Sequence, residues 1–245
     1  MNRPPSIHRV QSHNTATDSE NRIHDDRVAA ALGFRGGLVP GVAVYGYMVP
    51  AIVEQLGREW LARGSANFRL VAPCYEGETV VTRCHGSAVS AEHEDGSLYA
   101  SGTVSMDGDT PAAGTLQPYA PPPPDQRPVA SPATVVAGKL LGSIRRTVET
   151  SNAIQVPECL LHWANQILMA NFVMTAWIHA GSHVRHHRLP ASGEQIEIRG
   201  AIQECFERKG RQFAVAGLSF LENDAPSASE LVASVRHTFI YDLGP

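Results

Sequence analysis

The stretch GVAVYGYMVPAIVEQLG, residues 41–57, decides the fold, because it has the length of a helix and is apolar on nearly every side. A helix without a polar face has to be buried. A single sheet that curls around the helix achieves this burial, so we expect a helix wrapped by a curved antiparallel sheet. Pro50 removes one hydrogen bond from the helix, and we expect a kink or a break there.

A second apolar stretch of helix length, PECLLHWANQILMANFVMTAWI at residues 157–178, lies in the other half of the chain. A shift of 116 residues places Gly41 on Pro157 and Arg69 on Arg185, and it superposes the turn EGETV on the turn SGEQI. The chain therefore contains two copies of one unit. We expect the copies to pack as a pseudo-dimer whose strands form one continuous or closely abutting sheet.

Alternating apolar and polar residues follow each helix, which is the pattern of half-buried strands. The predicted strands are residues 79–87 and 98–106 in the first copy and residues 195–207, 212–221 and 231–241 in the second. The proline-rich QPYAPPPPDQRP favours an extended spacer between the copies. We therefore predict an α+β protein with an N-terminal unit (1–116), a linker (117–128) and a C-terminal unit (129–245).

The composition narrows the class of protein. With 43% hydrophobic and 18% charged residues the chain is typical of a globular protein, and a net charge of −4 without a basic run argues against nucleic acid as a partner. The N-terminus lacks an apolar signal region, and no apolar run is long enough to span a bilayer. We expect a cytoplasmic protein without membrane contact. The scattered cysteines predict reduced thiols and no zinc site.

A second informative stretch, TDSENRIHDDRVAAALGFRGGLVPG at residues 17–41, surrounds His24 with acidic residues and glycines. It resembles the motif of the MaoC-like branch of the hot-dog fold, the R-specific enoyl-thioester hydratases and dehydratases. The residues that match the family motif are Thr17, Asn21, Ile23, His24, Asp26, Gly33, Phe34 and Gly41. The resemblance covers roughly residues 7–106 and reaches the second half only in architecture. It implies a double hot-dog fold.

Three positions depart from the family motif. Ser19 stands where the family has its catalytic Asp, Arg22 stands where Pro follows the Asn, and Pro40 stands where a His precedes the helix glycine. Asp18, one residue before Ser19, is the candidate replacement for the missing carboxylate. A loop can absorb an offset of one residue, whereas a strand would turn the side chain to its other face.

The resemblance implies a lyase that adds or removes water across the alpha–beta bond of an acyl thioester, carried on coenzyme A or an acyl-carrier protein. It assigns His24 as base or acid, since histidine titrates near neutral pH. The Gly41 N–H at the helix start suits the oxyanion, and Asn21 shapes the loop or positions water. No metal or redox cofactor is implied. Further candidate site residues are Ser19, Val42 and Tyr45, although Tyr45 is equally compatible with core packing.

Three other functions stay open: another hot-dog chemistry that uses His24 without an Asp (thioesterase, isomerase or cyclase), a non-catalytic acyl-binding module, and a purely structural pseudo-dimer. In the second copy the 116-residue shift puts Leu140 at the position of His24, so we predict no active site there. Whether two chains form a homodimer is left open. We interpret four histidines of the second copy as polar strand residues at the contact between copies: His179, His183, His186 and His187.

Overall fold

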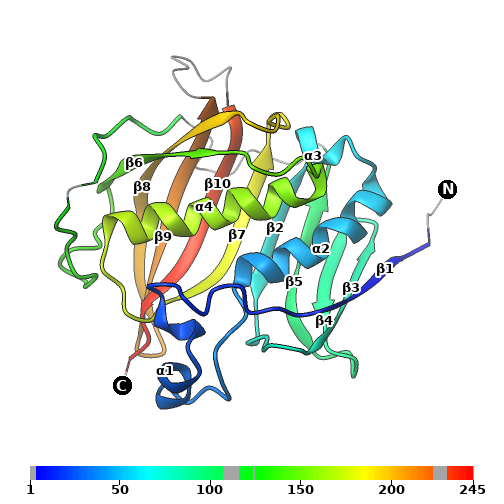
Figure 1. Cartoon of the computed structure of the whole chain (residues 1–245), viewed down its shortest axis with the longest axis horizontal. Helices are drawn as coiled ribbons and strands as arrows, with labels where there is room; N and C mark the ends of the chain where they lie inside the picture. Colours follow the sequence, from blue (N-terminus) through cyan, green and yellow to red (C-terminus); the bar gives the residue numbers. More distant parts are fainter. Residues whose placement is uncertain (1–3, 107–115, 124, 223–230, 245) are drawn as a thin grey trace.

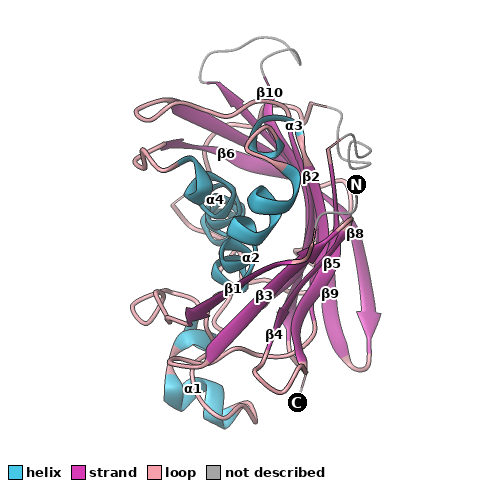
Figure 2. Cartoon of the chain, turned by 90° about the vertical axis from the view of Figure 1, so that its right-hand side faces the viewer, coloured by secondary structure: helices cyan, strands magenta, loops and turns pink. Residues whose placement is uncertain are grey.

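The computed structural model describes residues 4–106, 116–123, 125–222 and 231–244. One ten-stranded sheet with the strand order β1-β3-β4-β5-β2-β7-β10-β9-β8-β6 curves around two long helices (Figure 1, Figure 2). Every pairing of neighbouring strands in this sheet is antiparallel. The predicted α+β architecture, two helix-in-sheet units that share a continuous sheet, is confirmed.

The two halves contribute equivalent strands in reverse order across the sheet. They join where β2 pairs with β7, with Asn67 opposite His183, two residues that the 116-residue shift also superposes. The strands of the first half are β1 (Ser6–Gln11), β2 (Ser65–Leu70), β3 (Thr79–His85), β4 (Ala88–Glu92) and β5 (Leu98–Ser105). Those of the second half are β6 (Leu140–Thr147), β7 (Ile178–His186), β8 (Gln195–Arg208), β9 (Arg211–Glu222) and β10 (Leu231–Asp242).

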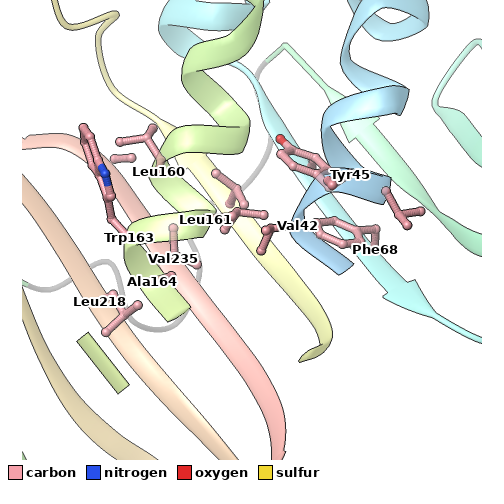
Figure 3. Packing of buried hydrophobic residues seen from close by; sticks show 14 of the residues in the cluster. Val42, Tyr45, Phe68, Leu160, Leu161, Trp163, Ala164, Leu218 and Val235 are labelled. Carbon is pink, nitrogen blue, oxygen red and sulfur yellow. The ribbon is translucent and has the colours of Figure 1, made fainter. Parts of the chain in front are cut away.

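The two apolar stretches form α2 (Gly41–Leu56) and α4 (Val156–Asn171), which lie on the concave face of the sheet (Figure 2). They contact each other, and side chains from both helices pack against the strands (Figure 3). The core residues labelled there include Val42 and Tyr45 of α2, Leu161 of α4, and Leu218 and Val235 of the sheet, all of them buried. The sheet therefore buries both helices, as expected for helices with apolar residues on nearly every side.

Two helix predictions need correction. Helix α2 continues through Pro50 and does not break there. Helix α4 ends at Asn171, seven residues before the predicted end, because Phe172 has an extended backbone. The chain that follows contacts the N-terminal loop, where the Arg22 N–H donates to the Thr175 carbonyl at 2.7 Å. This long-range pairing withdraws the segment from the helix.

The predicted strands did not include β1, β2, β4, β6 or β7, although the interpretation of the histidines had placed a strand near β7. The shorter elements are η1 (Arg22–His24), α1 (Asp26–Ala31), α3 (Trp60–Arg63) and η2 (Ala153–Gln155). The described residues of the proline-rich segment up to Pro123 have no regular secondary structure and lie beside β6, where the Ser143 N–H donates to the Ala120 carbonyl at 3.2 Å. Within the described ranges, no helix is both long and apolar enough to cross a membrane.

Candidate active site

His24 ends the short helix η1, and the residues before it fix its position. The Ser19 hydroxyl accepts a hydrogen bond from the Asn21 N–H at 3.1 Å. The Asn21 side chain then caps η1 by accepting from the Ile23 N–H at 3.4 Å. Ser and Asn commonly form such local turns through their side chains. The family carboxylate position is thus occupied by a hydroxyl that shapes the loop.

The buried Asn21 also joins this loop to the second half of the chain. Its Oδ1 accepts from the Trp177 N–H at 3.1 Å, and its Nδ2 donates to the Trp177 carbonyl at 3.0 Å. The same Nδ2 lies 3.4 Å from His24 Nε2. The amide therefore satisfies a buried backbone pair and faces the histidine ring, which supports the predicted loop-shaping role.

His24 is half-buried and has its lone pair on Nε2. Its Nδ1 lies 2.6 Å from the Leu38 carbonyl, which can only accept, so Nδ1 bears the proton. The unprotonated Nε2 accepts the long contact from Asn21 Nδ2 at 3.4 Å and is the nitrogen that could act as a base. Burial lowers the pKa of His24 below its ordinary value and outweighs the contact with Leu38, which raises it. The ring is consequently neutral at pH 7, the state that a general base requires.

The start of α2 presents two free backbone donors. The N–H groups of Ala43 and Val44 donate to the Pro40 carbonyl at 2.9 and 3.2 Å, and Pro40 provides no side-chain cap. The N–H groups of Gly41 and Val42 have no hydrogen-bond partner in the described part of the chain. Free N–H groups at a helix start favour an oxygen that carries negative charge.

Two cavities adjoin at these groups. The first, called the apolar cavity, has a volume of about 190 Å³ and is lined by His24 and Gly41 together with Ile23, Phe34, Val44, Leu70, Trp177 and Ile240. The second, called the polar cavity, has a volume of about 730 Å³ and lies between the halves. Both cavities are lined by the same five residues: Asn21, His24, Pro40, Asn165 and Trp177. A ligand could therefore extend from one cavity to the other past His24.

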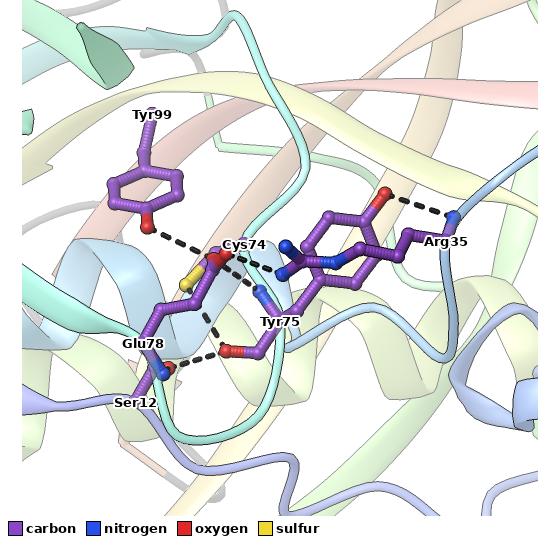
Figure 4. A network of polar contacts seen from close by, with 6 residues as sticks. All are labelled: Ser12, Arg35, Cys74, Tyr75, Glu78 and Tyr99. Carbon is purple, nitrogen blue, oxygen red and sulfur yellow. Dashed lines mark hydrogen bonds and ion pairs between the residues drawn. The ribbon is translucent and has the colours of Figure 1, made fainter. Parts of the chain in front are cut away.

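A polar network holds one wall of the apolar cavity in place (Figure 4). The Glu78 carboxylate accepts from the Tyr75 N–H and from the Tyr99 hydroxyl, each at 2.9 Å, and pairs with Arg35. The Arg35 guanidinium also lies 4.2 Å from the centre of the Tyr75 ring. These contacts fasten the loop between α1 and α2 to the segment before β3, where Cys74 lines the cavity.

Two predicted site residues lie elsewhere. Asp18 is exposed and lines a surface pocket next to the polar cavity with Arg127, and it lines neither the apolar nor the polar cavity. Tyr45 lies in the core, where its ring stacks on Phe68 at 4.6 Å and burial raises its pKa. It lines neither cavity. Core packing, which the sequence had left open, accounts for the Tyr45 ring, and its hydroxyl is buried without a hydrogen-bond partner in the described part of the chain. Ser19 and Val42 line the polar cavity and Gly41 lines the apolar one.

Glu158 is a carboxylate that the sequence reasoning missed. It lies in the first turn of α4, lines the polar cavity together with His24, and occupies space beside Gly46 that a β-carbon would fill. Burial raises the pKa of Glu158 to about 7. An acidic residue in the first turn of a helix is common and gave no signal. Only the packing of α4 against α2 brings Glu158 into the cavity.

The second half contains a structural copy of the His24 motif. The Thr150 hydroxyl accepts from the Asn152 N–H at 3.1 Å, and Asn152 caps η2 by accepting from the Ile154 N–H at 3.2 Å. Gln155 ends this copy, so Gln155 is the counterpart of His24. The assignment of Leu140 was wrong, because Leu140 begins β6. The local shift is 131 residues, 15 more than the shift of the helices, since the first half inserts residues 25–39 between motif and helix.

The four histidines in and just after β7 differ in how deeply they are buried. His179 and His186 are buried, His183 is half-buried and His187 is exposed. Among the residues with described placement, no three His, Cys, Asp or Glu side chains gather where a metal could bind. His186 packs edge-on against Trp60, with ring centres 5.1 Å apart. His179 lines the apolar cavity, which the strand interpretation did not anticipate.

No family model matches the chain, and no curated protein matches its sequence. Solved structures match almost its whole length. A protein from Mycobacterium tuberculosis with a double hotdog fold has a TM-score of 0.61 at 12% identity, over 96% of this chain and 95% of that chain. A protein described as a MaoC domain dehydratase, from Chloroflexus aurantiacus, has a TM-score of 0.57 at 13% identity, over 99% and 95%.

An acyl-CoA thioesterase II, TesB2 from Mycobacterium marinum, also matches, with a TM-score of 0.57 at 14% identity over 96% of this chain and 92% of that chain. These likenesses show a double hot-dog fold, and the predicted resemblance to MaoC-like hot-dog proteins is confirmed at the level of the fold. Because dehydratases and thioesterases share it, the chemistry has to be argued from the site.

Proposed function

We propose that this double hot-dog protein is an acyl-thioester hydratase or dehydratase with one active site, built around His24. The observation that carries the proposal is that the unprotonated Nε2 of a neutral His24 and the free N–H groups at the start of α2 lie at two cavities with shared lining residues. His24 Nε2 can accept or donate a proton, and the N–H groups of α2 can hydrogen-bond the oxygen on which negative charge develops.

The cavities fit the two parts of an acyl thioester. The acyl chain occupies the apolar cavity, and its thioester carbonyl accepts hydrogen bonds from the N–H groups of Gly41 and Val42. The carrier arm, from coenzyme A or a carrier protein, leaves through the polar cavity, whose walls include Arg146 and Gln166. Small-molecule sites usually have this composition, with apolar walls and a few placed polar groups.

In the dehydration direction, His24 Nε2 removes a proton from carbon 2 of a 3-hydroxyacyl thioester. The electron pair moves to the carbonyl oxygen, where the α2 N–H groups stabilise the enolate. The enolate then forms the double bond between carbons 2 and 3 and expels the hydroxyl, which takes a proton and leaves as water. We assign His24 as the donor of this proton, because it carries the proton taken from carbon 2 and lines the apolar cavity, whereas Glu158 lines only the polar cavity.

A second chemistry is favoured by one observation. No carboxylate within the described residues makes a hydrogen bond or ion pair with the His24 ring. A single histidine with an oxyanion donor is sufficient to activate water for thioester hydrolysis, or to move a double bond by shuttling one proton. Thioesterase and isomerase activities are therefore the alternatives to hydration.

Three acyl-CoA substrates distinguish these chemistries: crotonyl-CoA for hydration, 3-butenoyl-CoA for the double-bond shift, and butyryl-CoA for thiol release. We expect hydration of crotonyl-CoA that falls by roughly 10²–10⁴-fold in His24→Ala, the usual effect of losing a general acid or base. Thiol release or a double-bond shift that depends on His24, without hydration, would reassign the reaction. Binding of all three without turnover would indicate an acyl-binding module.

A further inference from the structure

His179 presents to the apolar cavity a ring nitrogen that makes no hydrogen bond with the described part of the chain. The residue lies near the start of β7, is 5% exposed and lines the cavity. Its Nδ1 is buried and has no hydrogen-bond partner in the described part of the chain. A β-carbon on Gly41 would lie 3.0 Å from this nitrogen, so Nδ1 sits beside the start of α2. A buried polar atom without a partner costs free energy and calls for an explanation.

A chain of hydrogen bonds determines which form of the ring is present. His237 Nε2 lies 3.0 Å from Asn165 Oδ1, and because the amide oxygen only accepts, Nε2 carries the His237 proton. The Ser182 hydroxyl therefore donates to His237 Nδ1 at 2.8 Å. Its oxygen in turn accepts from His179 Nε2 at 2.9 Å. His179 thus has its proton on Nε2, and Nδ1 faces the cavity with a lone pair.

His179 remains neutral during any reaction near pH 7. Burial lowers the pKa of His179 to about 3, and it lowers the pKa of His237 well below its ordinary value. The two rings stack with their centres 4.2 Å apart, so a charge on one would be repelled by a charge on the other. A group with a pKa near 3 is protonated in about one molecule in 10⁴ at pH 7. His179 is therefore an acceptor of hydrogen bonds and not a proton carrier.

We infer that His179 is a specificity-determining residue that accepts a hydrogen bond from a hydroxyl group of the acyl chain, on carbon 2 or carbon 3. This inference rests on the proposed function, which places the thioester carbonyl at the start of α2. Since Nδ1 lies beside Gly41, the atoms within its reach are those next to the carbonyl. Neither the carbonyl nor a plain alkyl chain has a proton to donate. Leu70 and Ile178, nearby in the cavity wall, offer no side-chain donor.

Calorimetric binding to the His24→Ala protein tests the inference without turnover. The probes are butyryl-CoA, 2-hydroxybutyryl-CoA and 3-hydroxybutyryl-CoA, each hydroxy compound as separate enantiomers. We expect at least one hydroxy compound to bind about tenfold more tightly than butyryl-CoA, the effect of one net hydrogen bond. Equal affinity for all probes would overturn the inference, because water would then serve Nδ1. If no probe binds, the proposed function itself fails.

Two substitutions of His179, made in the same background, separate recognition from structure. His179→Gln places an amide nitrogen where Nε2 contacts Ser182 but lacks a counterpart of Nδ1. We expect it to lose the preference for the hydroxy compound and to keep its unfolding temperature and its affinity for butyryl-CoA. His179→Asn keeps a polar atom at the Nδ1 position and loses the Ser182 contact, so we expect lower stability and a retained preference. A preference that survives in His179→Gln would overturn the inference.

Discussion

The two copies of the motif, residues 19–24 and 150–155, have the same local hydrogen bonds and different surroundings. In each, a hydroxyl accepts from the asparagine N–H and the asparagine caps a short helix. Asn21 is buried against Trp177, whereas Asn152 and Gln155 are exposed. The comparison shows that the motif by itself forms only a turn. In the first copy, burial of the turn and a neighbouring loop place His24 in the candidate active site.

The loop in question is the insertion at residues 25–39, which the second copy lacks. It supplies the Leu38 carbonyl that holds His24 Nδ1, and it separates the motif from α2 so that the helix start faces the cavity. In the second copy η2 runs directly into α4, and Pro157 occupies the first turn. We therefore expect an oxyanion to bind at the motif of the first copy and not at that of the second.

The largest effect should come from giving the first copy the residue of the second. His24→Gln keeps a polar side chain of similar length but cannot take a proton near pH 7, so turnover should fall by roughly 10²–10⁴-fold. The matched control adds Gln155→His to the His24→Gln protein and should not restore turnover, because Gln155 lines the polar cavity but lacks the loop that positions His24. Steady-state kinetics beside melting temperatures test both variants. Equal turnover of His24→Gln and wild type would remove His24 from the reaction.

The two asparagines should differ in their contribution to stability. Asn21→Ala leaves the buried backbone pair of Trp177 without partners and should lower the free energy of unfolding by about 2–4 kcal/mol. Asn152→Ala removes only an exposed cap and should cost about 0.5–1 kcal/mol. Urea unfolding measures both values. Similar losses would mean that the contact between the halves at Trp177 adds nothing.

Glu158 should make stability depend on pH. Its pKa is raised from 4.5 to about 7 in the folded chain, so between these values the folded chain keeps a proton that the unfolded chain has released. Stability therefore falls as pH rises from about 4.5 to about 7, by about 2 kcal/mol, and the loss is complete above that range. Glu158→Gln should abolish this part of the pH dependence, whereas Glu149→Gln, at the exposed rim of the same cavity, should not. Identical profiles would contradict the burial of Glu158.

The smallest effect is expected at Asp18. Because its side chain is exposed and lines neither cavity beside His24, Asp18→Asn should change turnover by less than about twofold. A loss as large as that of His24→Gln would restore Asp18 as the replacement carboxylate. It would also require the loop to rearrange when substrate binds.

Much of the fold of this protein can be predicted from local sequence patterns. The apolar stretches at 41–57 and 157–178 have to be buried wherever they occur, and alternating residues after them have to form strands with one covered face. The 116-residue shift then predicts a duplicated unit and a shared sheet, and the spacing of Asn21, His24 and Gly41 predicts a loop that leads into a helix start. These features depend on residues close together in the sequence, so no tertiary information was needed.

The composition of the site depended on contacts between distant segments. Whether Asp18 or Glu158 shares a cavity with His24 is decided by the packing of α4 on α2, and whether Tyr45 lines a pocket is decided by Phe68 of β2. The counterpart of His24 was misassigned because the inserted loop changes the shift from 116 to 131 residues. His179 joins the site only because β7 pairs with β2 and passes the start of α2. Side-chain periodicity determines which face of an element is buried, but only the assembled sheet and helices determine which buried groups meet.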